Sequence, residues 1–185
     1  MAVLPVTVYG DKILREKTKR IEAVNDELIA DIQNMFATMR HASGIGLAGN
    51  QMNLNKSLFI IDLNGVEGYE DFKPVVMINP ELIELSEETS VFEEGCLSLP
   101  NLRADVVRPK QIKVKFLDTD EKEMELEADE LFARVILHEY DHLIGKMIPD
   151  RVTPQIKRKL QKELMHIMKR EVECDYELTG RKRIK

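Results

Sequence analysis

The stretch LFARVILHEYDHLIGKM, residues 131–147, carries the strongest structural signal in the chain. Its apolar residues recur at helical spacing, which predicts an amphipathic helix. His138 and His142 are four residues apart, so both imidazoles lie on one face and can reach one metal ion. Glu139 sits about 100° round the helix, where its carboxylate can take a proton from a water beside the ion. This His-Glu-x-x-His pattern predicts a metal site.

The alternative interpretation is a pair of polar residues on the solvent-facing side of a surface helix. The neighbouring sequence argues against it, because residues 131, 132 and 135–137 are apolar and cover several sides of the helix. Such a helix is largely buried, and buried His and Glu side chains need partners. The chain has only four His, so the spacing is also uncommon by chance.

The composition describes a globular protein. A length of 185 residues suits one domain, 1–185, in which 150–185 form a C-terminal helical extension. Charged residues make up 32% with a net charge of −6, which argues against a general nucleic-acid binder. We expect no membrane span, no secretory signal in MAVLPVTVYG and no disulfide framework from two Cys. These features together predict a cytoplasmic protein.

Hydrophobic periodicity predicts helices around a strand-rich middle. An N-terminal helix should begin at Asn25 or Asp26 and run to about residue 40, and a C-terminal helix should open at Thr153-Pro154. The expected strands are 57–63, 75–79, 82–85, 105–107, 112–117 and 124–128. Strands grouped in the middle favour an α+β fold, with antiparallel sheets packed around the central metal-bearing helix, over alternating βαβ units.

A glycine-rich stretch, HASGIGLAGNQ, occupies residues 41–51. Three glycines within it indicate close backbone approach or unusual dihedral angles, although an ordinary glycine-rich turn is the simpler interpretation of the stretch taken alone. A phosphate loop is disfavoured because no Gly-Lys-Ser/Thr follows. Gln51 is the polar residue of interest here.

A catalytic site of this kind uses three protein ligands, so one more is needed. The candidates are Cys96, Cys174, His41, His166 and the many carboxylates. Cys96 lies in EEGCLSLP, residues 93–100, beside a glycine. A free Cys is often simply a small buried apolar residue, so the residues alone leave ligation and packing equally open for Cys96.

Three motifs resemble those of peptide deformylases, in the same order and at similar intervals: GIGLAGNQ (44–51), EGCLS (94–98) and HEYDH (138–142). The resemblance covers nearly the whole chain, and the C-terminus is similar to the bacterial class with a helical C-terminal extension. It implies a metal-dependent amidohydrolase of protein biosynthesis. Such an enzyme removes the N-formyl group from the formylmethionine of newly made polypeptides and releases formate.

The resemblance also implies the metal chemistry. Cys96, His138 and His142 would bind one divalent ion, with Fe(II) as the native metal and Ni, Co or Zn able to substitute. A thiolate ligand suits such soft to borderline metals. Glu139 would deprotonate the attacking water and pass the proton to the leaving amine.

The resemblance also implies the oxyanion donors and the substrate-binding residues. The side-chain amide of Gln51 and the backbone N–H of Leu97 would stabilise the oxyanion. The substrate would lie as an added strand between 44–46 and the segment around 94–97. The substrate-binding residues would be Gly44, Ile45, Gly46, Glu94, Gly95, Arg103, Leu131 and Val135. For Arg103, a surface salt bridge is an equally good alternative.

Two supporting contacts are expected around the ligands. Metal-binding His usually donates its second N–H to a carboxylate, and Glu94 is a candidate partner of His138. Asp141 is expected to pair with a cation such as Arg108.

The sequence departs from the family pattern at three positions. Gly49 replaces the second Ala of the first motif, and we expect the lost methyl to loosen the turn slightly. Leu137 stands where many members carry Gln, and Asn101 where some carry Gly. None of the three is a ligand, the base or Gln51.

Two rival functions remain open. A zinc peptidase of the His-Glu-x-x-His class would take its third ligand downstream, from Glu163, His166 or Glu171, but the Cys96 motif would then be unexplained. A non-catalytic module would dock on ribosomes through the basic C-terminal helix and the tail GRKRIK (180–185), although a solvated surface is the simpler interpretation. Truncation after residue 151 should leave an enzyme active on short peptides. We expect N-formylmethionyl nascent peptides as partners, no DNA, no membrane and a monomer.

Overall fold

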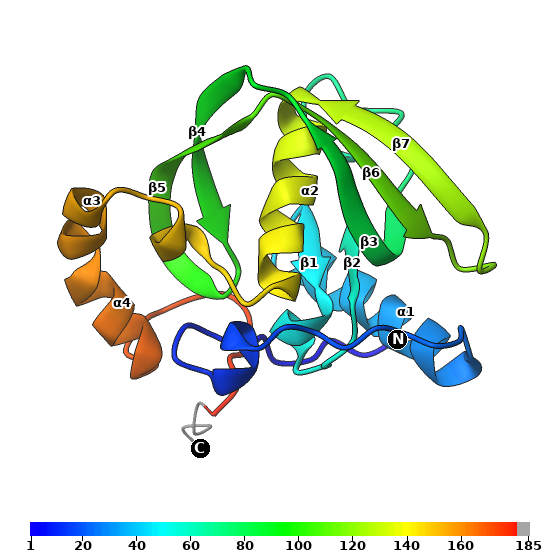
Figure 1. Cartoon of the computed structure of the whole chain (residues 1–185). Helices are drawn as coiled ribbons and strands as arrows, with labels where there is room; N and C mark the ends of the chain where they lie inside the picture. Colours follow the sequence, from blue (N-terminus) through cyan, green and yellow to red (C-terminus); the bar gives the residue numbers. More distant parts are fainter. Residues whose placement is uncertain (181–185) are drawn as a thin grey trace.

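The helix that carries the His-Glu-x-x-His motif stands at the centre of the fold (Figure 1). The computed structural model describes residues 1–180, and residues 181–185 of the predicted basic tail lie outside the described residues. The α-helices are α1 (Asp26–His41), α2 (Glu130–Leu143), α3 (Pro154–Lys159) and α4 (Gln161–Met168), and the 3₁₀ helices are η1 (Lys12–Arg15), η2 (Gly49–Met52) and η3 (Ile148–Asp150). The strands are β1 (Gly46–Ala48), β2 (Leu58–Ile61), β3 (Val75–Leu85), β4 (Thr89–Cys96), β5 (Leu99–Pro109), β6 (Gln111–Leu117) and β7 (Glu123–Asp129).

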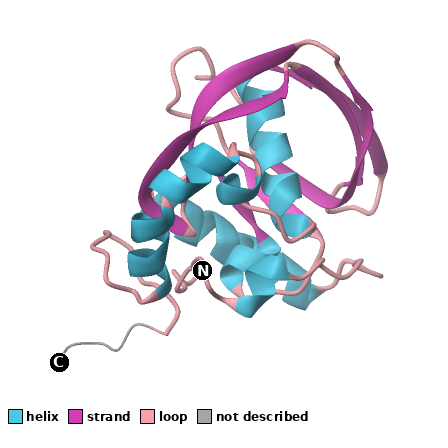
Figure 2. Ribbon diagram, turned by 60° about the vertical axis from the view of Figure 1, so that its left-hand side comes forward, coloured by secondary structure: helices cyan, strands magenta, loops and turns pink. Residues whose placement is uncertain are grey.

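Two antiparallel sheets surround α2. One has five strands in the order β1-β2-β3-β6-β7, and the other is the hairpin β4–β5. The strands curve around one end of the central helix (Figure 2). This arrangement confirms the predicted α+β fold with antiparallel sheets around the central helix.

The structure corrects several predicted boundaries. The two strands expected at 75–79 and 82–85 are one strand, β3, with a register shift between Ile78 and Glu81 where Asn79 adopts a φ of +50°. The central helix ends at Leu143, and Gly145 with a φ of +73° turns the chain away. The predicted single C-terminal helix is two short helices that meet at Leu160.

Three apolar clusters fix the elements that carry the site. The first packs α2 against the five-stranded sheet, through residues such as Phe59, Met77, Val114 and Ile136. A second joins α1 to β1 and β2, and α1 is capped by Asn25, whose side chain accepts the Leu28 N–H at 2.9 Å as predicted. The third packs α4 and the C-terminal segment under the β4–β5 hairpin.

None of the helices among residues 1–180 combines the length and apolarity that crossing a membrane requires.

Candidate active site

The His-Glu-x-x-His motif on helix α2 lies in the interior of the protein. His138 and His142 lie one turn apart with ring centroids separated by 5.2 Å, as the four-residue spacing predicts. Glu139 and His142 are only 3% and 1% exposed. The solvent-facing alternative for this motif is therefore wrong.

Cys96 meets the two imidazoles from the end of β4. A register shift between Gly95 and Cys96 ends the regular pairing of the hairpin, and Cys96 then faces α2. Its Sγ lies 3.2 Å from Nε2 of His142. Three possible ligand atoms, one each from Cys96, His138 and His142, lie within 4.8 Å of one another. No other group of three or more His, Cys, Asp or Glu residues within residues 1–180 could hold a metal ion in this way. Tetrahedral metal–sulfur and metal–nitrogen bonds of about 2.3 and 2.1 Å require similar separations, so the group fits a metal ion.

A carboxylate orients the first imidazole. Oε2 of Glu94 lies 3.0 Å from Nδ1 of His138, as predicted. Glu94 in turn accepts hydrogen bonds from Arg108 at 2.6 and 2.9 Å and from Arg134 at 3.0 Å. Burial alone would raise the pKa of Glu94, but the hydrogen bonds from Arg108 and His138 lower it well below its usual value. Glu94 is therefore ionised and leaves the second nitrogen of His138 for a metal ion.

The same arginine reaches a second buried carboxylate. Arg108 donates to Oδ2 of Asp141 at 2.7 Å, which confirms the predicted pairing, and Arg151 also binds Asp141. Arg108 further donates to the carbonyl of Leu137 at 3.3 Å. These contacts tie α2 to the hairpin that carries Cys96.

Glu139 lies against the backbone of β1. A Cβ on Gly46 would collide with Oε1 of Glu139 and come within 2.9 Å of Val135, so only glycine fits there. Oε2 of Glu139 is buried and makes no hydrogen bond with residues 1–180. Burial raises the pKa of Glu139 to about 7, which suits a group that exchanges protons near neutral pH.

A backbone hydrogen bond holds the side-chain amide of Gln51 in one orientation. Its Oε1 accepts the Ala48 N–H at 2.8 Å, which turns Nε2 toward the site. There Nε2 lies 3.2 Å from Oγ of Ser98 and 3.6 Å from Sγ of Cys96. The amide N–H groups therefore point at the place where the three ligand atoms meet.

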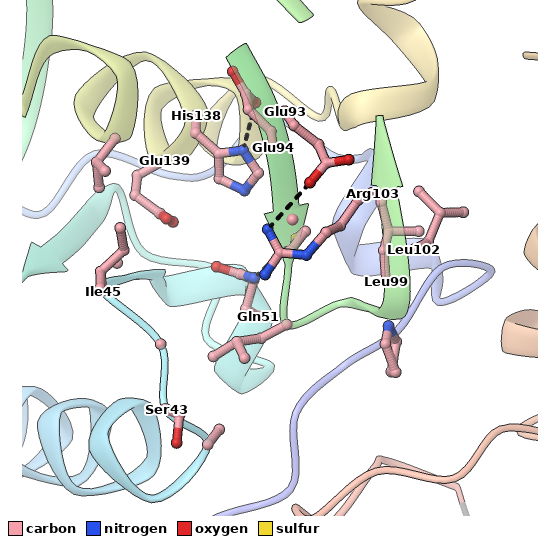
Figure 3. Close-up of a pocket in the computed structure, with 18 of the residues that line it drawn as sticks. Ser43, Ile45, Gln51, Glu93, Glu94, Leu99, Leu102, Arg103, His138 and Glu139 are labelled. Carbon is pink, nitrogen blue, oxygen red and sulfur yellow. Dashed lines mark hydrogen bonds and ion pairs between the residues drawn. The ribbon is translucent and has the colours of Figure 1, made fainter. Parts of the chain in front are cut away.

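A cavity of about 500 Å³ opens in front of these groups (Figure 3). The buried His142 is not among the lining residues. Every other predicted site residue lines the cavity: Gly44, Ile45, Gly46, Gln51, Glu94, Gly95, Cys96, Leu97, Arg103, Leu131, Val135, His138 and Glu139. Arg103 lies 4.0 Å from Glu93, and its side chain is 65% exposed, so both interpretations of Arg103 stay open.

Sequence reasoning missed three residues at the site. Arg134 precedes His138 by four positions and so shares its helical face, which was the available signal. Ser98, a partner of Gln51, belongs to the second motif but received no role. Tyr176 lines the cavity from the C-terminal segment, and no local pattern marks it.

Comparison with known proteins agrees with this geometry. The family model described as polypeptide deformylase matches residues 3–158. The chain belongs to the polypeptide deformylase family. The peptide deformylase of Chlorobium phaeobacteroides (strain BS1) is 42% identical over 174 residues, covering 94% of each chain. That of Salinibacter ruber is 40% identical over 183 residues, covering 95% of this chain and 94% of its own.

Solved peptide deformylases share the fold. The Ehrlichia chaffeensis enzyme in complex with actinonin has a TM-score of 0.83 at 30% identity, covering 94% of this chain and 100% of its own. The Thermotoga maritima peptide deformylase has a TM-score of 0.77 at 38% identity, covering 83% of this chain and 100% of its own. The predicted deformylase family is therefore confirmed. The peptidase alternative finds no support, because His166 pairs with Glu171 at 3.0 Å on the surface of the protein.

Proposed function

We propose that the chain is a metal-dependent hydrolase that removes the N-formyl group from the N-terminal formylmethionine of newly made polypeptides. The convergence of Cys96, His138 and His142 at the cavity, beside the buried carboxylate of Glu139, carries this proposal. Membership of the deformylase family supplies the reaction: water adds to the formyl carbon, the carbon–nitrogen bond breaks, and formate and a free amine leave.

The three ligands would hold one divalent ion. Fe(II) is the proposed native ion, with Ni, Co or Zn as substitutes, as the family resemblance implies. A thiolate with two imidazoles suits all of these soft to borderline metals and does not choose between them. When bound, such an ion polarises a carbonyl oxygen and increases the acidity of water. Glu94 keeps the His138 ring in the orientation that ligation needs.

Glu139 would be the general base and then the general acid. Its partnerless Oε2 is free to accept a proton from the attacking water. The same proton would then go to the amine nitrogen as the carbon–nitrogen bond breaks. A pKa raised to about 7 by burial allows both transfers at neutral pH.

Two donors would stabilise the oxyanion that develops on the formyl oxygen. One is Nε2 of Gln51, which the Ala48 N–H holds in position, and the other is the backbone N–H of Leu97. Donors that are fixed in advance need no reorganisation during the reaction, and losing one typically costs about 10²–10³ in rate.

The peptide would bind as an added strand between 44–46 and the end of β4. Ile45, Leu131 and Val135 offer apolar surface in the cavity for the methionine side chain. Arg103, on the rim, would contact the onward backbone of the substrate.

The test is formate release from formyl-Met-Ala-Ser by protein purified anaerobically, with metal analysis of the same sample. We expect turnover in proportion to bound metal. Glu139→Gln should keep the metal and lose about 10²–10⁴ in rate, as loss of a general base does. Glu130→Gln, at the exposed start of the same helix, is the matched control and should keep full rate. Metal-loaded protein that releases no formate, or that cleaves internal peptide bonds, would contradict the proposal.

Four further features belong to the same proposal. Residues 150–185 would extend a single domain, and the basic surface of α3 and α4 would be the site of any ribosome contact. We also propose a monomer that works in the cytoplasm. Co-sedimentation with ribosomes would test the ribosome contact, and light scattering would test the oligomeric state.

A further inference from the structure

The chain after α4 returns to the active site. Arg170, with a φ of +60°, reverses its direction, and in Figure 1 the red segment passes under the β4–β5 hairpin beside the blue N-terminal segment. We call residues 170–179 the return segment. Leu178 forms a parallel β-bridge with Val6, and the Asn101 side chain donates to the carbonyl of Glu173 at 2.8 Å. The return segment is therefore bound to both the N-terminal segment and the hairpin.

Tyr176 brings this segment to the catalytic turn. Its hydroxyl donates to the carbonyl of Leu97 at 2.8 Å, and its ring lines the cavity. Cys96 pairs with Leu99, so the Leu97–Ser98 peptide is the centre of a two-residue turn. A carbonyl at that place has no partner within the hairpin itself. The hydroxyl of Tyr176 holds it in one orientation.

The other carbonyl of the turn is also held from outside the hairpin. The N–H of Tyr9 donates to the Ser98 carbonyl at 3.0 Å. The N–H of Thr7, on the same N-terminal segment, donates to the carbonyl of Gln51 at 2.9 Å. The paired terminal segments thus hold the backbone at both of the proposed oxyanion donors.

We propose that Tyr176 is a positioning residue for deformylation. By fixing the central peptide of the turn, it limits rotation about Leu97 and keeps the Leu97 N–H directed into the cavity. This inference rests on the proposed function, in which Leu97 is an oxyanion donor. Tyr176 lies beyond residues 3–158, the part of the chain that matches the family model. The contact therefore joins the second motif to a segment outside the part that the family model matches.

Tyr176→Phe removes the hydroxyl and keeps the ring. Because the donor is loosened and not deleted, we expect kcat to fall about tenfold, less than the 10²–10³ of a lost donor. KM should stay within about twofold, because an interaction made only in the transition state affects kcat. In the zinc-loaded protein, the Leu97 carbonyl ¹³C resonance should shift as its hydrogen bond is lost. Tyr69→Phe, a half-buried tyrosine outside the cavity, is the control and should change none of these values.

The outcomes separate this inference from the proposed function. An unchanged kcat, or a raised KM at constant kcat, would overturn the positioning role. A lower kcat with an unmoved Leu97 carbonyl resonance would overturn it as well, because Tyr176 would then act on something else. If the wild-type protein released no formate, the proposed function would fail, while the carbonyl resonance would still report whether Tyr176 holds the turn.

Discussion

At the scale of single residues, Gly46 is where the backbone of β1 passes directly beside the carboxylate of Glu139. We predict that Gly46→Ala displaces Glu139 and lowers kcat by about 10²-fold, because an ångström-sized misplacement of a catalytic group has a cost of this size. The added methyl also crowds Val135, so the free energy of unfolding should fall by about 1–3 kcal/mol, while metal content should change little. Steady-state kinetics on a formyl-Met tripeptide measure the effect, and a variant with normal kcat would show that Glu139 has room to move.

Glu94 joins two cations and one imidazole within the protein interior: Arg108, Arg134 and His138. Glu94→Gln keeps the shape of the side chain and leaves buried arginines without their counter-charge. We predict a loss of about 3–5 kcal/mol in the free energy of unfolding. Metal affinity should fall by about 10–100-fold, because the orientation of His138 is no longer fixed.

Urea unfolding and competition with a metal chelator measure these two effects. The neighbouring Glu93, which is 64% exposed, provides the control, since Glu93→Gln should change stability by less than about 1 kcal/mol. Equal effects of the two substitutions would contradict a special role for the buried carboxylate.

At the scale of elements, the 3₁₀ helix η2 shows why one departure from the family motif is not neutral. The expectation that Gly49 merely loosens its turn is wrong. A Cβ on Gly49 would lie 2.8 Å from the carbonyl oxygen of Lys56 and 3.2 Å from the side chain of Leu58, so the chain packs too closely for alanine. The departure at Asn101 also has a reason, since its φ is +63°, a region that Asn and Gly tolerate best.

We therefore predict that Gly49→Ala lowers the free energy of unfolding by about 1–3 kcal/mol, the usual cost of overpacking. If the turn had spare room, alanine would instead stabilise the protein by about 0.4–1 kcal/mol through the unfolded chain. The sign of the change in a urea titration distinguishes the two cases.

The C-terminal elements support the hairpin that carries Cys96. Leu164, Ile167 and Leu178 are buried in one cluster with Leu99 and Val106 of β5. Truncation after residue 151 would remove this support and expose the underside of the hairpin. It is therefore a poor test between an enzyme and a docking module, whereas Tyr176→Phe leaves the apolar cluster in place.

At the scale of the whole molecule, Asp11 links the two ends of the described chain. It accepts hydrogen bonds from the Thr179 hydroxyl at 2.7 Å and the Val8 N–H at 2.9 Å, and it pairs with Arg170. Burial would raise the pKa of Asp11, but these hydrogen bonds lower it below its usual value of 3.8. The stabilisation is therefore present above pH ~4 and is lost as the pH falls through the lowered pKa.

We predict that Asp11→Asn costs about 1 kcal/mol of stability at pH 7, a value discounted for partial exposure. The difference from wild type should shrink as the pH falls from ~4 through the lowered pKa of Asp11, below which both proteins carry a neutral side chain. Asp175→Asn, at an exposed position of the return segment, is the control and should change stability little at pH 7. A difference that persists at low pH would mean that shape, not charge, is responsible.

The features that could be predicted from the sequence are those set by the spacing of residues within one short segment or motif. Helical spacing placed His138, Glu139 and His142 together, and the motif resemblance supplied Cys96 and Gln51, all of which line or back one cavity. The contacts of Glu94 with His138 and of Arg108 with Asp141 were predictable because a metal site needs supporting partners, but other contacts between distant positions were not. Tyr176 lies 79 positions from its partner Leu97, and the obstruction at Gly49 comes from the backbone of Lys56. Neither leaves a periodic or compositional signal.

The central claim is that one thiolate and two imidazoles bind the same ion. X-ray absorption spectroscopy of the metal-loaded protein tests it most directly. The account predicts one sulfur ligand at about 2.3 Å and two imidazole nitrogens at about 2.0–2.1 Å. Cys96→Ser should remove the sulfur contribution, and Cys174→Ser should leave it intact. A metal bound by the protein with no sulfur in its first coordination sphere would contradict the account.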